Sequence, residues 1–412
     1  MTSRRVRCVR DIGQLLDRSR PVVTLYSGGL DSSYLLKLLR DFEIRHVIAL
    51  AVDIGGDDGT ELLAERARRL GAELVVVDAR HEFAARFVAP AIQAQARYLG
   101  GHPISSSLSR PLIAEKAVRI ALDRDAQAIL HSAHPTQNTL RRINTSLELL
   151  DFAGVFGTPY ELTPVPRPIE AAELAHAGVA ELTGRAISLD ANLWCREFES
   201  GTIDDPERFA IPDELYTWTR AGQRAADSVT VTFDAGIPVE LDGRALDLVG
   251  LIEQLNSIAG AHGLGRYVGL EHVATGEKVL EAREMPAAHI LLHGYAALLS
   301  ATADAETIRE KLHQDQLWVR EAVEGRWFGR LRGAAQQFIS AVSAEVTGTV
   351  QLRLRGGRAE VSSIRAARPL YIRDREAWEY NVTRRGSAAL ELEADTTPML
   401  QKAGAHQPDP RS

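Results

Sequence analysis

One segment constrains this fold most: a short apolar run, followed by two glycines and then by a helical pattern. Residues 22–26 are rich in β-branched side chains and lead into residues 27–33, Ser-Gly-Gly-Leu-Asp-Ser-Ser. From Leu35 to Phe42, leucines and one phenylalanine recur at i, i+3, i+4 and i+7, which is one helix face. Glycines let a backbone approach a ligand closely, and the N–H groups of a first helical turn favour an anion. The segment therefore predicts a phosphate-binding turn between a strand and a helix.

The turn differs from two better-known nucleotide-binding motifs. It lacks the Gly-Lys-Ser/Thr ending of a Walker loop, and it lacks G-x-G-x-x-G. An ordinary strand-to-helix turn is the plainer alternative. Three serine hydroxyls beside the glycine pair favour phosphate binding, and Asp31 is placed either to cap the helix or to help hold Mg²⁺ on the phosphates.

Strand and helix patterns alternate through the first half of the chain. Further strands are expected at 46–54, 73–77 and 128–131, with helices at 61–70, 110–122 and 139–150. Unbroken apolar strands separated by helices indicate a parallel sheet covered on both faces, and ligands of such sheets bind beyond the carboxyl ends of the strands. The fold class is therefore α/β in this half.

The pattern changes after the proline-rich stretch at 163–168. Strands are expected at 229–233, 238–241, 350–354 and 359–361, with a helix over 245–258 that ends at Gly260. We therefore predict a nucleotide-binding domain over 1–170, an α+β domain over 171–370 and a C-terminal helical extension over 371–412. The last dozen residues are expected to form a loose tail.

Composition narrows the function classes. The 412 residues carry 55 acidic and 48 basic side chains, a net charge of −7, which argues against a general nucleic-acid binder. No apolar run reaches the ~18 residues of a membrane helix, and no leader pattern follows the start. The cysteines, Cys8 and Cys195, make neither a disulfide framework nor a metal knuckle. We expect a cytoplasmic protein that binds no membrane and no nucleic acid.

The turn resembles the pyrophosphate loop of the N-type ATP pyrophosphatases. Five further segments are similar to argininosuccinate synthases: Ala51–Gly55, Pro103–Pro111, Ser188–Trp194, Leu255–Arg266 and Trp327–Arg332. The resemblance implies a C–N bond-forming ligase that uses ATP and Mg²⁺. In that family, the ureido oxygen of citrulline attacks the α-phosphorus and pyrophosphate leaves. The amino group of aspartate then displaces AMP.

The resemblance also implies site residues. ATP binding is expected at Leu25, Tyr26, Ser27, Gly28, Gly29, Leu30, Asp31, Ser32, Ser33, Val52 and Ser132. Substrate binding is expected at His102, Ser106, Ser107, His134, Asn138, Thr139, Arg142, Ser188, Glu197, Glu271 and Arg283. Asp31, Asn138 and Arg142 are the expected catalytic residues, and Asp31 is also the expected ligand of Mg²⁺ on the phosphates.

The substrate positions depart from the family pattern more than the ATP turn does. His134 and Thr139 replace a Thr and an Asp that hold aspartate, and Pro-Thr-Gln replaces Gly-Lys-Gly at 135–137. His102 and Arg283 replace tyrosines, Glu197 replaces a serine, and Ser106 replaces a threonine. Such exchanges change the hydrogen-bonding groups of the substrate site, and therefore which ligand can pair with all of them. We therefore expect a divergent paralogue with altered substrates.

Several alternatives stay open at this stage. The exchanges could be tolerated in an ordinary synthase, and Glu197 with Arg283 could form a structural ion pair. A tRNA-modifying ATP pyrophosphatase and a catalytically silent ATP-binding homologue use the same turn. The resemblance also implies a homotetramer held partly by C-terminal helices, one of which could begin in Asp374–Asn381.

Overall fold

The computed structural model describes residues 5–56, 59–180, 182, 187–220, 227–273 and 276–385. The chain divides into two units between Arg368 and Pro369. In the second unit, α13 spans Arg375–Arg385 and confirms a helix in the predicted extension. The predicted loose tail lies outside the described residues.

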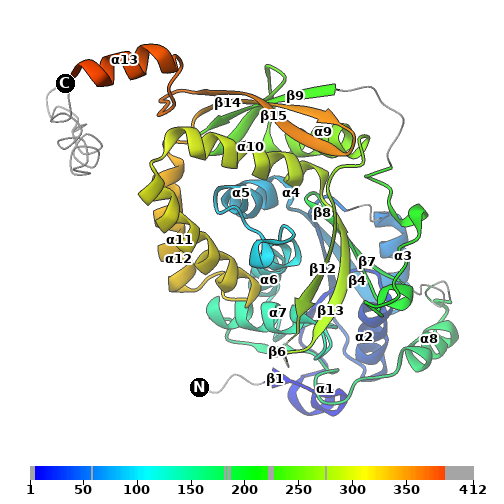
Figure 1. Cartoon of the computed structure of the whole chain (residues 1–412). Helices are drawn as coiled ribbons and strands as arrows, with labels where there is room; N and C mark the ends of the chain where they lie inside the picture. The colour runs from blue at the N-terminus through cyan, green and yellow to red at the C-terminus, as the bar shows by residue number, and fades with distance from the viewer. Residues whose placement is uncertain are drawn as a thin grey trace, which may run out of the picture. The chain divides into compact units, whose positions relative to one another are not determined.

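A six-stranded parallel sheet forms the first part of the larger unit (Figure 1), which confirms the α/β prediction. Its order is β1-β6-β5-β2-β3-β4. The strands are β1 (Arg5–Val6), β2 (Val22–Leu25), β3 (Val47–Asp53), β4 (Ala72–Asp78), β5 (Ala128–Leu130) and β6 (Val155–Gly157). The four strands expected from the sequence are all present, each within two residues of its predicted ends.

Helices cover both faces of this sheet because neighbouring strand residues point to opposite sides. Val22 packs in one apolar cluster with α2 (Leu30–Asp41) and α3 (Thr60–Arg69). Val23 packs in another with α6 (Ser106–Asp123) and α7 (Asn138–Leu149). The remaining helical segments of this half are α1 (Val9–Leu15), α4 (Arg80–Phe83), a π-helix (Ala84–Val88), α5 (Ala89–Gln93), a 3₁₀ turn (Tyr98–Gly100) and α8 (Arg167–His176).

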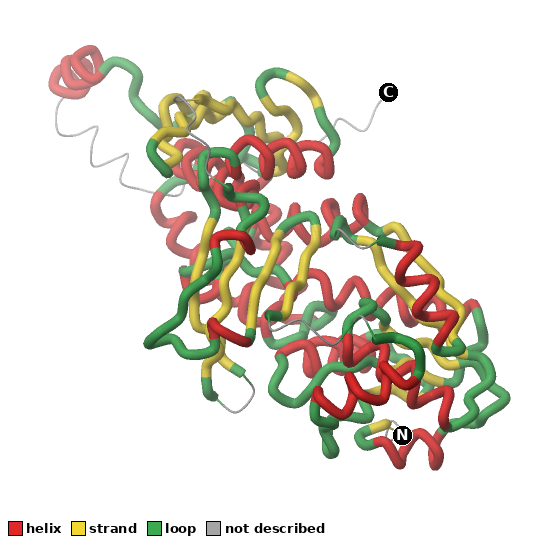
Figure 2. The backbone as a smooth tube through the Cα atoms, turned by 90° about the vertical axis from the view of Figure 1, so that its right-hand side faces the viewer, coloured by secondary structure: helices red, strands yellow, loops and turns green. Residues whose placement is uncertain are grey.

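The second half contains a five-stranded antiparallel sheet in the order β11-β10-β9-β14-β15. Its strands are β9 (Asp227–Asp234), β10 (Ile237–Leu241), β11 (Arg244–Ala245), β14 (Gly348–Arg355) and β15 (Arg358–Ala366). The helices α9 (Leu248–Gly260) and α10 (Pro286–Thr302) share its apolar core. Figure 2 shows the strands in yellow and the helices in red, from the side.

A four-stranded antiparallel sheet that the sequence reading missed has the order β12-β13-β8-β7. Its strands are β7 (Ser188–Asn192), β8 (Cys195–Glu199), β12 (Arg266–His272) and β13 (Lys278–Glu284). The reading also missed α11 (Ala305–Val323), α12 (Arg330–Ser343) and two 3₁₀ turns (Gly201–Ile203 and Asp213–Leu215). One core joins Phe83, Leu108, Trp194 and Trp318, so both halves belong to the same unit.

No helix within the described ranges is long and apolar enough to cross a membrane. Cys8 and Cys195 are both free. Cys195 is fully buried, and burial raises the pKa of its thiol.

Candidate functional site

The glycine turn lies at the carboxyl end of β2 and opens α2. Gly28 has φ +71°, and a Cβ there would lie 2.1 Å from Leu63 Cδ2, so the turn requires glycine. Gly29 is the N-cap of α2, and no side chain caps this helix. Asp31 therefore does not cap it, although it lies in the first turn. The uncapped N–H groups are available to an anion.

The hydroxyl groups of the turn differ in exposure. Ser27 is exposed, and its Oγ lies 3.2 Å from Ser32 Oγ and accepts a weak 3.4 Å hydrogen bond from Gly29 N–H. Ser32 and Ser33 are buried. Ser27 and Gly29 are therefore the members of the turn whose surface a ligand can reach most easily.

The other predicted ATP residues flank the turn or support it. Val52 is the last residue but one of β3, and Ser132 lies just beyond β5, so both lie at the carboxyl edge of the strands that neighbour β2, and both are half-buried. Tyr26 and Leu30 pack in the core, and Leu25 ends β2. The structure thus brings the predicted ATP residues to one edge of the sheet.

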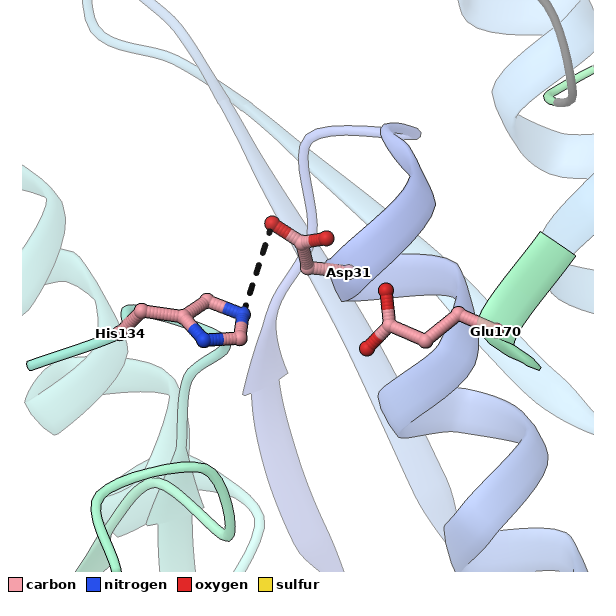
Figure 3. Close-up of side chains that lie close together, drawn as sticks. All are labelled: Asp31, His134 and Glu170. Atoms are coloured by element: carbon pink, nitrogen blue, oxygen red, sulfur yellow. Dashed lines mark ion pairs between the residues drawn. The ribbon is translucent and has the colours of Figure 1, made fainter. Parts of the chain in front are cut away.

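A second group of polar side chains adjoins the turn (Figure 3). Asp31 Oδ2 lies 3.8 Å from His134 Nε2, and one ligand atom from each of Asp31, His134 and Glu170 lies within 4.8 Å of the other two. The His134 ring stacks on Tyr160, with centroids 5.0 Å apart and planes 5° apart. Tyr160 donates its hydroxyl to the backbone oxygen of Asp31 at 3.1 Å.

Burial dominates the electrostatics of this group. It raises the pKa of Glu170 to about 8, with the Asp31 carboxylate adding to the shift. Burial also lowers the pKa of His134, which outweighs the attraction of Asp31. Sequence reasoning missed Glu170 and Tyr160. The available signal was a glutamate one helical turn before the buried Leu174, on the apolar face of α8.

A third group surrounds Glu271 on β12. Arg142 Nη2 donates to Glu271 Oε1 at 2.6 Å, and Asn138 Nδ2 donates to the same oxygen at 2.9 Å. Arg142 Nη1 also donates to Ser106 Oγ at 2.8 Å. Burial by itself would raise the pKa of Glu271, but Arg142 and Arg283 outweigh it and lower that pKa to about 2.

Arg283 is held by three carboxylates. Its Nε donates to Glu197 Oε2 at 2.9 Å, its Nη2 donates to Glu271 Oε2 at 3.0 Å, and Nη2 also pairs with Glu281. Arg283 stands opposite Glu197 in the register of β13 and β8. The structural ion pair, which the sequence left open, is therefore present. Glu281 was not singled out from the sequence.

The remaining predicted substrate residues divide into two sets. His102 is buried, with Nε2 4.0 Å from Glu271 Oε2, and burial together with Arg283 lowers its pKa to about 4. Ser107 is buried in the first turn of α6. Thr139 instead accepts a 3.4 Å hydrogen bond from Arg110, and Ser188 is exposed on β7. No hydrogen bond links the Thr139 or Ser188 side chain to Glu271 among the described residues.

Buried polar atoms near Glu271 point to a ligand. Asn138 Oδ1, His102 Nε2 and Arg283 Nη1 have no hydrogen-bond partner among the described residues. Buried polar atoms are normally paired, so a polar ligand with both donors and acceptors suits this group. Residues 131–142 connect it to the glycine turn, because His134 contacts Asp31 while Asn138 and Arg142 contact Glu271.

Comparisons with known proteins identify similar families and relatives. The profile of the Arginosuccinate synthase N-terminal HUP domain matches residues 21–153, and that of the Arginosuccinate synthase C-terminal domain matches 187–389. Argininosuccinate synthase from Rubrobacter xylanophilus is 36% identical over 90% of this chain and 91% of its own length. That from Pyrococcus furiosus is 34% identical over 85% and 86%.

A third relative and one solved structure complete the comparison. Argininosuccinate synthase from Symbiobacterium thermophilum is 37% identical over 82% of this chain and 86% of its own length. A solved NH3-dependent NAD synthetase from Campylobacter jejuni matches 43% of this chain and 73% of its own, at 14% identity and a TM-score of 0.29.

Proposed function

This chain belongs to the argininosuccinate synthase family, and from that premise we propose that it is an ATP-dependent ligase that forms a C–N bond and releases AMP and pyrophosphate. One observation carries the proposal. Helix α2 starts after Gly28 without a side-chain cap. Residues 131–142 connect this helix start to the buried polar group around Glu271, which has unpaired donors and acceptors.

The reaction depends mainly on the alignment of the first substrate with ATP. An oxygen of the first substrate must face the α-phosphorus of ATP while the pyrophosphate leaves on the opposite side. The backbone N–H groups at Gly29 and the first turn of α2 suit the charge that develops on the pyrophosphate. Asn138 and Arg142 lie one helical turn apart on α7, and we assign them to the first substrate.

Asp31 fits the role proposed for it toward Mg²⁺. Its Oδ1 is buried and accepts no hydrogen bond from the described residues, so a cation would satisfy it. When bound, Mg²⁺ would offset the negative charge of the phosphates. The protein's own contribution is to hold Asp31 in place, through the hydroxyl of Tyr160 on its backbone oxygen.

We further propose that the substrates differ from citrulline and aspartate. Both oxygens of Glu271 are engaged by protein cations, and Arg283 fills space beside Glu197. His134 is stacked on Tyr160 and faces Asp31. A ureido-, amide- or carboxylate-bearing small molecule with an amine donor is the class of substrates that we propose, in a divergent paralogue of the synthases.

The test is a product assay. The purified protein with Mg-ATP is screened against pairs of ureido, amide or carboxylate compounds and amine donors, and the released nucleotides are separated by chromatography. We expect AMP and pyrophosphate with a productive pair. ADP and phosphate would reject the proposal, and so would tight ATP binding with no turnover across the panel. Retention of tRNA through purification would favour a tRNA-modifying enzyme.

A tetramer remains part of the proposal. The second unit exposes several large apolar side chains: Leu370, Ile372, Trp378 and Tyr380. Exposed apolar clusters of this kind are typical of association surfaces. Light scattering of the full chain should give four times the chain mass, and a monomeric mass would reject this assignment.

A further inference from the structure

Glu170 is an unusual residue in this protein. Its side chain is fully buried on α8, and neither carboxyl oxygen has a hydrogen-bond partner among the described residues. A buried carboxylate without a partner is costly, so such groups normally acquire a proton or a cation. The proposed ligase reaction assigns no role to Glu170.

Two further ligand-type side chains face the same space. Figure 3 shows the Glu170 carboxyl group directed toward Asp31, with the His134 ring on the other side of Asp31. Asp31 Oδ1 is also buried without a hydrogen-bond partner among the described residues. Arg167 forms a long ion pair with Asp31 Oδ1, its Nη1 lying 3.9 Å away and beyond hydrogen-bond distance, and its side chain is mostly exposed.

We propose that Asp31, His134 and Glu170 form a divalent-cation site beside the glycine turn, occupied without nucleotide. Two carboxylate oxygens and one imidazole nitrogen suit Mn²⁺ or another transition ion better than Mg²⁺, which favours oxygen ligands. His134 is already oriented for this role by its stack on Tyr160. Glu170 and His134 are thus assigned as ligands in addition to Asp31.

The spacing requires the side chains to move closer together. Three ligand atoms that share one ion at bonds of about 2.0–2.2 Å lie about 3–4 Å from one another. The ligand atoms here lie within 4.8 Å of one another, so the Asp31 or Glu170 side chain must rotate to complete the site. The alternative to a bound cation is a proton that Asp31 and Glu170 share.

The experiment measures Mn²⁺ binding to the full chain in the absence of ATP. Free Mn²⁺ is followed by electron paramagnetic resonance during titration, and we expect one bound ion per chain. Glu170→Gln should weaken binding at least about tenfold. Glu173→Gln is the matched control, because Glu173 lies on the same helix but pairs with Lys37, and it should leave binding unchanged.

Two further readouts separate ligation from misfolding. Pulsed resonance on bound Mn²⁺ should show coupling to a nitrogen, which His134→Gln should remove. Mn²⁺ should raise the melting temperature of the unmodified protein and not that of Glu170→Gln. No Mn²⁺ binding without nucleotide, or equal binding by Glu170→Gln, would overturn the site. Either result would leave AMP release from Mg-ATP, measured separately, as the test of the ligase proposal.

Discussion

Arg283 Nε lies 2.9 Å from Glu197 Oε2, directly across the paired strands β13 and β8. Both residues stand where the sequence comparison expected contacts with a substrate. Arg283 is almost completely buried, and it also contacts Glu271 and Glu281. The pair therefore links β13 to β8 in the small antiparallel sheet.

Removing Arg283 alone should destabilise the protein strongly. Arg283→Met leaves buried carboxylates without their shared cation, which typically costs about 3–5 kcal/mol. Glu197→Gln in the same chain removes one of these charges and should restore part of the loss. Urea unfolding of both single variants and the double variant measures the coupling. Strictly additive changes in the free energy of unfolding would contradict a direct interaction.

Exchanging the pair for the family's residues should move substrate preference. Glu197→Ser combined with Arg283→Tyr recreates the side chains that the sequence comparison expects in a synthase of citrulline and aspartate. We expect kcat/KM for citrulline to increase in the double variant relative to the unmodified chain, measured by pyrophosphate release. The proposed change of specificity would be wrong if the unmodified chain already used citrulline and aspartate efficiently.

Gly28 should be indispensable to ATP turnover. Gly28→Ala places a Cβ 2.1 Å from Leu63 Cδ2 at a φ of +71°, a backbone conformation that is strained for alanine, so the turn or the Leu63 side chain must shift. Misplacing its N–H donors should lower kcat/KM for ATP by about 100-fold or more. Gly333→Ala is the control, since nothing lies within 4 Å of its added Cβ, and its turnover should stay unchanged. Normal turnover by Gly28→Ala would rule out this turn as the ATP site.

His131 should make the protein sensitive to acid. Its Nδ1 accepts a hydrogen bond from Ala133 N–H at 3.2 Å, and burial lowers its pKa to about 4. Between pH 6.5, the ordinary pKa of histidine, and about pH 4, His131 is protonated in the unfolded chain but neutral in the folded chain. The contribution of His131 to the free energy of unfolding is therefore fully present above pH 6.5. It falls by about 3 kcal/mol as the pH falls toward 4.

The measurement is the urea midpoint across that range. His131→Gln should be less stable at pH 7, because it disturbs the contacts with Ala133 and Asn144. Its midpoint should nevertheless fall less steeply between pH 6.5 and 4 than that of the unmodified chain. Parallel pH profiles would show that His131 is not the titrating group.

The parallel sheet could be predicted because its signals are local. Val22 to Leu25 is rich in β-branched residues and almost entirely buried, and the glycine turn that follows it fixes where α2 begins. The small antiparallel sheet was missed because its strands carry charges that face inward. Glu197, Glu281 and Arg283 look like exposed residues in the sequence, but they pair with one another, Glu197 from β8 and Glu281 from the same strand as Arg283.

For the candidate site, Asn138, Arg142 and Glu271 were each expected near the substrates, and the first two hydrogen-bond to the third. Glu170 was missed because nothing in a single sequence shows that a glutamate on α8 packs beside Asp31, 139 residues earlier in the chain. The domain boundaries near residues 170 and 370 stay predictions.

The products formed from ATP test the central claim most directly. With Mg-ATP and a productive pair of substrates, phosphorus NMR should show AMP and pyrophosphate appearing in equal amounts, with both absent in Gly28→Ala. Formation of ADP and inorganic phosphate by the unmodified chain would contradict cleavage between the α- and β-phosphates, and with it the assigned reaction.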